Sequence, residues 1–305
     1  MRRALVAVAL LAALAGPVQA SSGSSVQTAD PPALAAAAWY LVGEDGAVLA
    51  QESSRRSRAI ASITKLMTAI VALEEARPSE VIQVRSQAAG VGGSTVYLRA
   101  GDELSVGELV RAMLIPSAND AATALALHVG NGSTARFVSL MNAKARELGL
   151  VDTTFVNPHG LDEPGHVSSA RDATLLVRYA LGVPSIRAAL EQSSFSLPGG
   201  QKFPTTDDLL GSWPPLLGGK TGHTLGAGWS EAAAASRRGA TVYGTVLGVD
   251  SREGRNDALR TLLEFGLDRY SGSRSSMRVV CTEKPRPNTG KRASRLLRRG
   301  RFCVR

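Results

Sequence analysis

Apolar runs separated by short turns occur near both ends of the chain, and this pattern predicts β-strands. An apolar and aromatic run over 35–43, the dipeptide Asp45-Gly46 and a second apolar run over 47–51 predict a β-hairpin. An amphipathic segment over 255–270 predicts a closing helix. Glycine-rich turns separate three more short apolar segments, which predict neighbouring antiparallel strands: 216–224, 228–236 and 241–249.

The middle of the chain has the spacing and the caps of helices. Ser62 begins an apolar helical pattern that runs to Leu73. Ser105 and Glu108 form a predicted capping box for the next helix. Further helices are predicted over 119–130, 133–149 and 169–181. Strands at both ends with helices between them predict one α+β domain, with an antiparallel sheet that the terminal strands share, flanked by helices.

The first twenty residues have the pattern of an export signal. Arg2 and Arg3 precede an apolar run, and Val18-Gln19-Ala20 resembles a cleavage site. We therefore predict a signal peptide (1–20) and secretion across the cytoplasmic membrane to an extracellular or wall-associated location, with a retained N-terminal anchor as the alternative. The predicted organisation continues with a flexible leader (21–32), a central folded domain (33–270) and a basic tail (271–305).

The net charge of +9 is concentrated outside this central domain. Residues 284–305 contain nine basic side chains and no acidic ones, and Arg2 and Arg3 add two, which leaves −2 for 21–283. A nearly neutral body excludes a nucleic-acid binder. The tail is predicted to be solvated, with weak contact to an anionic wall or membrane surface as the alternative. Cys281 and Cys303 either form a disulfide within this tail or remain free thiols.

Three short motifs contain candidate catalytic residues. In Ser62-Ile63-Thr64-Lys65 the i, i+3 spacing places a hydroxyl and an amine on one helix face, where the amine can act as the base for the hydroxyl. That role requires a lowered lysine pKa, because few lysines are neutral at pH 7. The alternative is a helix-capping serine beside a surface lysine.

The second motif is Ser117-Ala118-Asn119, in which the hydroxyl can relay a proton and the amide can hold a substrate carbonyl. A turn or helix cap is the alternative. The third is Lys220-Thr221-Gly222 on a predicted edge strand, where an ammonium and a hydroxyl can bind a carboxylate and Gly222 lets a substrate backbone lie close. The alternative is an ordinary glycine-rich turn. Random sequences of this composition contain the triple about 0.01 times, so the combination is specific.

These motifs, in this order, are the signature of penicillin-binding proteins and class A β-lactamases. The chain further resembles the low-molecular-mass D-alanyl-D-alanine carboxypeptidases of peptidase family S11 over about 33–250. The similar segments are the sequences on both sides of Ser62 and Ser117, together with Met141–Ala145, Asn157–Asp162 and Ser168–Asp172.

This resemblance implies a β-lactamase/transpeptidase-like fold with a helical subdomain beside the cleft. Ser62 would be acylated with Lys65 as its base, and Ser117 and Asn119 would line the cleft. Lys220 and Thr221 would bind the terminal carboxylate of a peptidoglycan stem peptide. The backbone N–H groups of Ser62 and His223 would form the oxyanion hole. β-Lactam antibiotics would be covalent inhibitors, and no cofactor is expected.

Other functions remain open from the sequence. A DD-endopeptidase would cleave cross-links with the same residues. A β-lactamase would need a glutamate that activates water, and the nearest candidate, Glu163, lies outside an E-x-x-L-N pattern. A non-catalytic wall-binding module would not need Ser62, Lys65 and Lys220 together. His159 and His166 are predicted to order a loop rather than to bind a metal, and His128 is predicted to end a helix.

Overall fold

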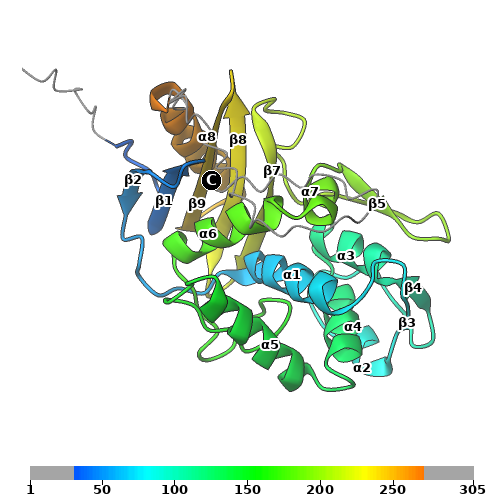
Figure 1. The fold of residues 1–305 in the computed structure, drawn as a ribbon. Helices are drawn as coiled ribbons and strands as arrows, with labels where there is room; N and C mark the ends of the chain where they lie inside the picture. The colour runs from blue at the N-terminus through cyan, green and yellow to red at the C-terminus, as the bar shows by residue number, and fades with distance from the viewer. Residues whose placement is uncertain (1–30, 271–305) are drawn as a thin grey trace, which may run out of the picture. The chain divides into compact units, whose positions relative to one another are not determined.

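The computed structural model describes residues 31–270 (Figure 1). The predicted signal peptide, most of the predicted leader, and the basic tail with Cys281 and Cys303 lie outside the described residues. The described part contains an antiparallel sheet with helices against it, so the predicted α+β class is confirmed.

The main sheet has five strands in the order β2-β1-β9-β8-β7. Each neighbouring pair is antiparallel, and β1 pairs with β9, so strands from both ends of the domain share one sheet as predicted. The strands are β1 (Ala38–Gly43), β2 (Val48–Glu52), β7 (Leu216–Thr224), β8 (Gly228–Arg237) and β9 (Ala240–Val249). Because β7 lies at the edge, the Lys220-Thr221-Gly222 motif has only one strand neighbour.

Helices cover both faces of this sheet. Helix α8 (Arg252–Arg269) packs on β8 and β9 from one side, and α6 (Ala170–Leu181) packs on the other (Figure 1). Along β8, Ala232 and Ala234 belong to the core on the α6 side, and Ala233 and Ala235 to the core on the α8 side. A strand buried on both faces has a nearly continuous apolar sequence, which explains the four consecutive alanines.

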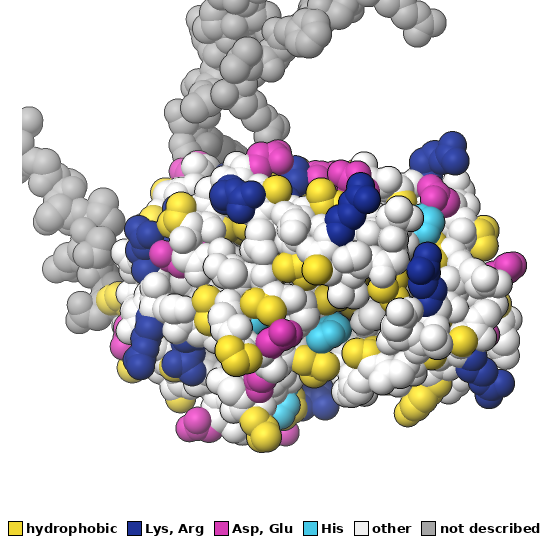
Figure 2. All heavy atoms as spheres, turned by 90° about the horizontal axis from the view of Figure 1, so that it is seen from below, with side chains coloured by type: hydrophobic (Ala, Val, Ile, Leu, Met, Phe, Trp, Pro, Cys, Tyr) yellow, Lys and Arg dark blue, Asp and Glu magenta, His cyan; other side chains and the backbone are white. Residues whose placement is uncertain are grey.

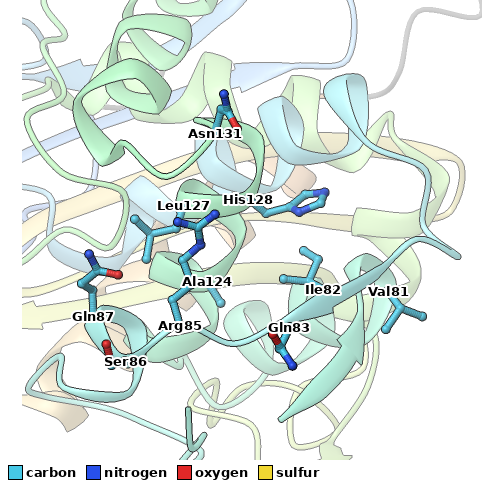
Figure 3. A pocket seen from close by; sticks show the side chains of 10 residues that line it. All are labelled: Val81, Ile82, Gln83, Arg85, Ser86, Gln87, Ala124, Leu127, His128 and Asn131. Carbon is cyan, nitrogen blue, oxygen red and sulfur yellow. The ribbon is translucent and has the colours of Figure 1, made fainter. Parts of the chain in front are cut away.

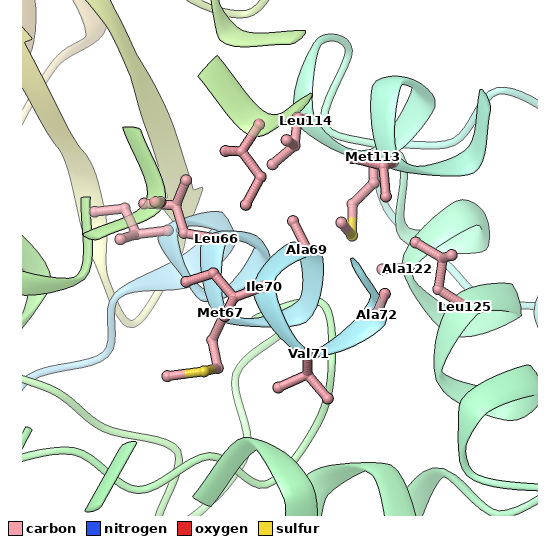
Figure 4. Packing of buried hydrophobic residues seen from close by; sticks show 14 of the residues in the cluster. Leu66, Met67, Ala69, Ile70, Val71, Ala72, Met113, Leu114, Ala122 and Leu125 are labelled. Atoms are coloured by element: carbon pink, nitrogen blue, oxygen red, sulfur yellow. The ribbon is translucent and has the colours of Figure 1, made fainter. Parts of the chain in front are cut away.

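Helix α1 (Lys65–Glu75) runs through the centre of the helical part of the fold. Its residues from Lys65 to Ala72 are all buried, because its sequence is apolar nearly all round. Figure 4 shows Ala69 and Ala72 of α1 near Met113 and Leu125 of the two neighbouring helices. This packing fixes the N-terminal end of α1, where Ser62 and Lys65 lie.

Helices α3 (Val106–Leu114), α5 (Thr134–Glu147) and α6 begin at the caps that the sequence predicts. Ser105 forms a capping box with Glu108, and Ser133, Ser169 and Ser251 each accept a hydrogen bond from a backbone N–H three residues later. The first of these caps α3 and the second caps α5. The other longer helices are α4 (Asn119–Val129) and α7 (Pro184–Leu190).

Several elements differ from the sequence prediction. Ser62 does not begin an α-helix but lies in a 3-10 turn, η1 (Ala61–Thr64), and α1 starts at Lys65. The closing helix starts three residues earlier than predicted, at Arg252. Helix α7 and five short elements were not predicted: α2 (Ser86–Ala89), β3 (Val81–Gln83), β4 (Glu103–Ser105), β5 (Ser194–Ser196) and β6 (Lys202–Pro204).

The surface of the described domain mixes charges of both signs. Figure 2 shows lysine and arginine side chains scattered among acidic ones on the face it presents, rather than gathered into one patch. Within residues 31–270, no helix has the length and apolar character needed to span a membrane.

Candidate active site

Ser62 and Lys65 lie in direct contact at the junction of η1 and α1. The Nζ atom of Lys65 is 2.6 Å from Oγ of Ser62. Lys65 is completely buried, whereas Ser62 is partly exposed. The i, i+3 spacing therefore joins the two side chains as the sequence predicts, although through a 3-10 turn. The alternative from the sequence does not fit, because Ser62 makes no cap and Lys65 is not on the surface.

The loop that contains Asn157–Asp162 holds this pair in place. Lys65 Nζ donates a second hydrogen bond to the carbonyl oxygen of His159, at 2.8 Å. The Oγ1 of Thr68 on α1 donates to the carbonyl oxygen of Pro158, at 2.6 Å. Gly160 has φ of +90°, and a Cβ there would lie 1.9 Å from the carbonyl oxygen of Ala61. The loop thus packs directly against the turn that carries Ser62.

The environment of Lys65 favours its neutral form. Burial lowers its pKa well below the ordinary value, and the positive charge of Lys220 lowers it further, against the charge of Asp120. These two neighbours belong to the third motif and to the helix that follows the second. Lys220 of the third motif therefore acts on the charge of Lys65, and a neutral amine beside a hydroxyl can accept its proton.

Ser117 and Asn119 lie at the start of α4, and both are buried. Ser117 has φ of +67°, a left-handed backbone that is unusual for serine. The helix cap is Ala118, which makes no side-chain cap, so the capping alternative does not hold. Asn119 Nδ2 donates to the carbonyl oxygen of Gly92, at 2.7 Å. Asn119 therefore also anchors the 92–98 loop.

Lys220 and Thr221 are buried on edge strand β7. Lys220 Nζ donates to the carbonyl oxygen of Thr221, at 3.1 Å, and Thr221 Oγ1 is 2.6 Å from Oγ1 of Thr206. Burial lowers the pKa of Lys220 to about 7 against the raising effect of nearby carboxylates. An ionised substrate carboxylate would favour the ammonium form, since an opposite charge raises a lysine pKa.

Gly222 lies against the turn that carries Ser62. A Cβ at Gly222 would lie 2.8 Å from the carbonyl oxygen of Ile60 and 3.1 Å from the backbone nitrogen of Ser62. Glycine is therefore required here for the contact between β7 and η1. His223 follows on the strand, and its exposed ring stacks on Trp229 with centroids 4.1 Å apart.

The loop histidines make hydrogen bonds within the fold, as predicted. His166 Nδ1 accepts from the backbone N–H of Val156, so the proton lies on Nε2, which is 2.8 Å from Oγ1 of Thr64. Among residues 31–270, no cluster of His, Cys, Asp and Glu side chains is arranged to hold a metal. Glu163, the acidic candidate for a β-lactamase, accepts from Asn157 Nδ2 at 3.1 Å.

A separate cavity of about 690 Å³ lies between β3, α2 and α4. Figure 3 shows Arg85, Gln87 and His128 among the side chains that line it. None of the predicted site residues contributes to its walls. His128 is near the end of α4 as predicted, 2.7 Å from Glu80.

Comparison with known proteins identifies the family of this chain. The Peptidase S11 family, described as D-alanyl-D-alanine carboxypeptidase, matches residues 25–251. The chain is 34% identical over 283 residues to the D-alanyl-D-alanine carboxypeptidase DacD of Salmonella typhimurium, covering 88% of this chain and 72% of that protein. It is 33% identical to DacF of Bacillus subtilis, covering 74% of this chain and 60% of that protein, so the match spans less than two thirds of DacF.

Solved structures share the fold. The Streptomyces K15 DD-transpeptidase superposes with a TM-score of 0.74 at 28% identity, covering 79% of this chain and all of that one. Penicillin-binding protein 6B of Escherichia coli superposes with a TM-score of 0.74 at 33% identity, covering 80% of this chain and 81% of that one. The predicted β-lactamase/transpeptidase-like fold is therefore confirmed. By its sequence, its fold and the match over 25–251, the chain belongs to the S11 family of D-alanyl-D-alanine carboxypeptidases.

Proposed function

We propose that this protein is a serine-type D-Ala-D-Ala carboxypeptidase that removes the terminal D-alanine from peptidoglycan stem peptides. One observation carries the proposal: the hydroxyl of Ser62 is 2.6 Å from a completely buried lysine amine. Because burial and Lys220 lower the pKa of Lys65, this amine is a more available base than an ordinary lysine.

In the acylation step, Lys65 Nζ accepts the proton of Ser62 as Oγ attacks the carbonyl carbon of the penultimate D-alanine. The backbone N–H groups of Ser62 and His223 would donate to the developing oxyanion, and donors of this kind typically contribute about 10²–10³ each in rate. The close packing of Gly222 on the Ser62 turn brings the two backbone segments together.

The amide bond then breaks and D-alanine leaves as the amine, because Lys65 gives up the proton it took from Ser62 and the hydroxyl of Ser117 passes it to the leaving nitrogen. In the second step, Lys65 accepts a proton from water as the water oxygen attacks the ester, and it returns this proton to Oγ of Ser62 as the shortened peptide leaves. Both steps use the same base, in agreement with the lowered pKa of Lys65.

Lys220 and Thr221 would bind the terminal carboxylate of the substrate, and Asn119 would hold its backbone. A buried ammonium is a strong partner for a carboxylate, because little water screens the interaction. β-Lactams, which have an acylating carbonyl and a carboxylate, would react with Ser62 as covalent inhibitors. We further propose that the protein is exported and acts in the cell wall.

Release of D-alanine from a diacetylated L-Lys-D-Ala-D-Ala tripeptide tests the proposal. The protein should release D-alanine, and Ser62→Ala should not. A Ser105→Ala variant, altered at a helix cap outside the three motifs, provides a matched control that should remain active. Release that persists in Ser62→Ala, or no release by the unmodified protein, would contradict the proposal.

A further inference from the structure

A buried carboxyl group lies behind the proposed carboxylate subsite. Glu231 on β8 is directly opposite Thr221 on β7 in the strand register. Its side chain is 0% exposed, and neither carboxyl oxygen accepts a hydrogen bond from any of residues 31–270. Because an unsatisfied buried carboxylate is costly, this group requires an explanation.

Glu231 forms an ion pair with the guanidinium of Arg255. Arg255 Nε is 3.1 Å from Glu231 Oε2, and Arg255 is also buried. Its hydrogen bonds go elsewhere: Nε donates to Asn256 Oδ1 at 3.1 Å, and Nη2 donates to Asp208 Oδ2 at 2.9 Å. Glu231 therefore receives the attraction of a positive charge without a hydrogen bond.

The charges around the subsite cancel when all groups are ionised. The charges that act on Glu231 are those of Arg255 on α8, Lys220 on β7, and Asp207 and Asp208 in the segment that precedes β7. The buried cations Lys220 and Arg255 match the buried acids Glu231 and Asp207. Asp208 pairs with both Arg252 and Arg255. Adding a substrate carboxylate to this set would leave one negative charge in excess.

We propose that Glu231 is a positioning residue that competes with the substrate carboxylate for the positive charge of Lys220 and Arg255, and that it takes up one proton from solvent when that carboxylate binds. This inference rests on the proposed function, because it takes Lys220 and Thr221 as the carboxylate subsite. Neutral Glu231 restores the net positive charge that an anionic ligand requires.

The charges around the proposed carboxylate subsite support proton uptake at Glu231. Burial raises its pKa well above the ordinary value, the charge of Asp207 raises it further, and Arg255 and Lys220 oppose both. A second carboxylate nearby would raise this pKa again. Glu231 therefore has one pKa in the free protein and a higher one in the complex. By linkage, each unit of difference between them lowers the affinity for the carboxylate about tenfold once the pH exceeds both.

The test uses the Ser62→Ala protein, in which peptide binding is measured without turnover. Infrared difference spectra with the diacetylated L-Lys-D-Ala-D-Ala tripeptide, recorded from about pH 6 to about pH 9, report on buried carboxyl groups. Above the pKa of Glu231, binding should produce the C=O stretch of a protonated carboxyl. This band should be absent when Glu231→Gln is added.

Affinity provides the second readout. Peptide affinity should decrease as the pH rises from about 6 to about 9. In the protein with Glu231→Gln this decrease should be about tenfold smaller, because one proton-linked step is removed. Glu264→Gln is the matched control. Glu264 lies on α8, nine residues after Arg255, and accepts a hydrogen bond from Nε1 of Trp213. It should leave the band and the pH profile unchanged.

Three outcomes would overturn the inference: no carboxyl band on binding, a band that persists with Glu231→Gln, or no binding at any pH. Glu231→Leu, which replaces a buried charge by an apolar group, is a second variant if Gln prevents folding. The wild-type protein is assayed in parallel for D-alanine release. Release together with any of these outcomes would overturn only the role of Glu231, whereas no release would also contradict the proposed function.

Discussion

Two residues of the candidate site have backbone conformations that their side chains disfavour. Ala61 has φ of +46° and Ser117 has φ of +67°. Non-glycine residues rarely adopt this left-handed region, and such strain persists only where the surroundings impose it. At Ala61 the surroundings are Gly160 and Gly222, which pack on the turn from two sides. Close packing at Gly160 and Gly222 thus helps to hold Ser62 against Lys65.

In the proposed mechanism Lys65 loses and regains a proton. Lys65→Arg keeps a positive charge but cannot act as a base, because arginine remains protonated. We expect the rate of D-alanine release to fall by about 10²–10⁴, the usual contribution of a general base. The activity of the unmodified protein should decline at acid pH as Lys65 becomes protonated. An arginine variant with near-normal turnover would contradict this role.

Gly222 tests the contact between β7 and the Ser62 turn. Gly222→Ala should reduce stability by about 1–3 kcal/mol, as overpacking does, because its Cβ would meet backbone atoms of Ile60 and Ser62. It should also slow acylation. Gly199→Ala, where a Cβ meets nothing within 4 Å, is the matched control and should change neither property. Thermal unfolding and acylation rates measure the difference, and equal behaviour of the two variants would refute the steric argument.

At this scale the sequence predicts side chains that are close along the chain. The i, i+3 spacing predicts the contact of Ser62 with Lys65. The hydrogen bond from Lys65 to His159 joins residues 94 positions apart and could not be predicted from local spacing. Glu231 was also missed, because one glutamate in a predicted strand normally indicates a solvent-facing position.

At the scale of elements, the long helices depend on local chemistry. The capping box of Ser105 and Glu108 satisfies donors at the start of α3. Ser105→Ala should lower the free energy of unfolding by about 0.5–2 kcal/mol, the usual cost of losing an N-cap. Catalytic activity should be unchanged because the cap lies outside the three motifs. Denaturant unfolding measures the stability, and no loss would show that the cap is dispensable.

Elements with strong local patterns were predicted within a few residues, and the exceptions have a physical cause. Strands β3 to β6 have three residues each, too short to show a two-residue period. The turn η1 continues into α1, so apolar spacing alone cannot locate the boundary between them. The pairing of β1 with β9 was predicted because strands occur at both ends of the domain.

For the whole molecule, buried histidines make stability depend on pH. Burial lowers the pKa of His159 to about 3 and that of His166 to about 4. In the unfolded chain both rings titrate near 6.5, so the unfolded state binds more protons between about pH 6.5 and about pH 4. Stability should therefore fall by a few kcal/mol as the pH decreases through this window.

Unfolding by denaturant at a series of pH values measures this dependence. His166→Asn should flatten the fall between about pH 6.5 and about pH 4, because one of the two proton-linked groups is removed. The variant loses the contact with Thr64 at every pH, so the slope rather than the absolute stability is diagnostic. An unchanged slope would show that His166 is already protonated in the folded protein.

Ser62 is proposed to form an acyl-enzyme with a neutral Lys65 as its base. This step can be followed by intact mass measured over time with excess benzylpenicillin, with Ser62→Ala beside the unmodified protein. We expect one long-lived adduct per chain, absent in Ser62→Ala. Rapid consumption of the drug without a lasting adduct would indicate a β-lactamase, and an unmodified protein with intact drug would contradict the catalytic role of Ser62.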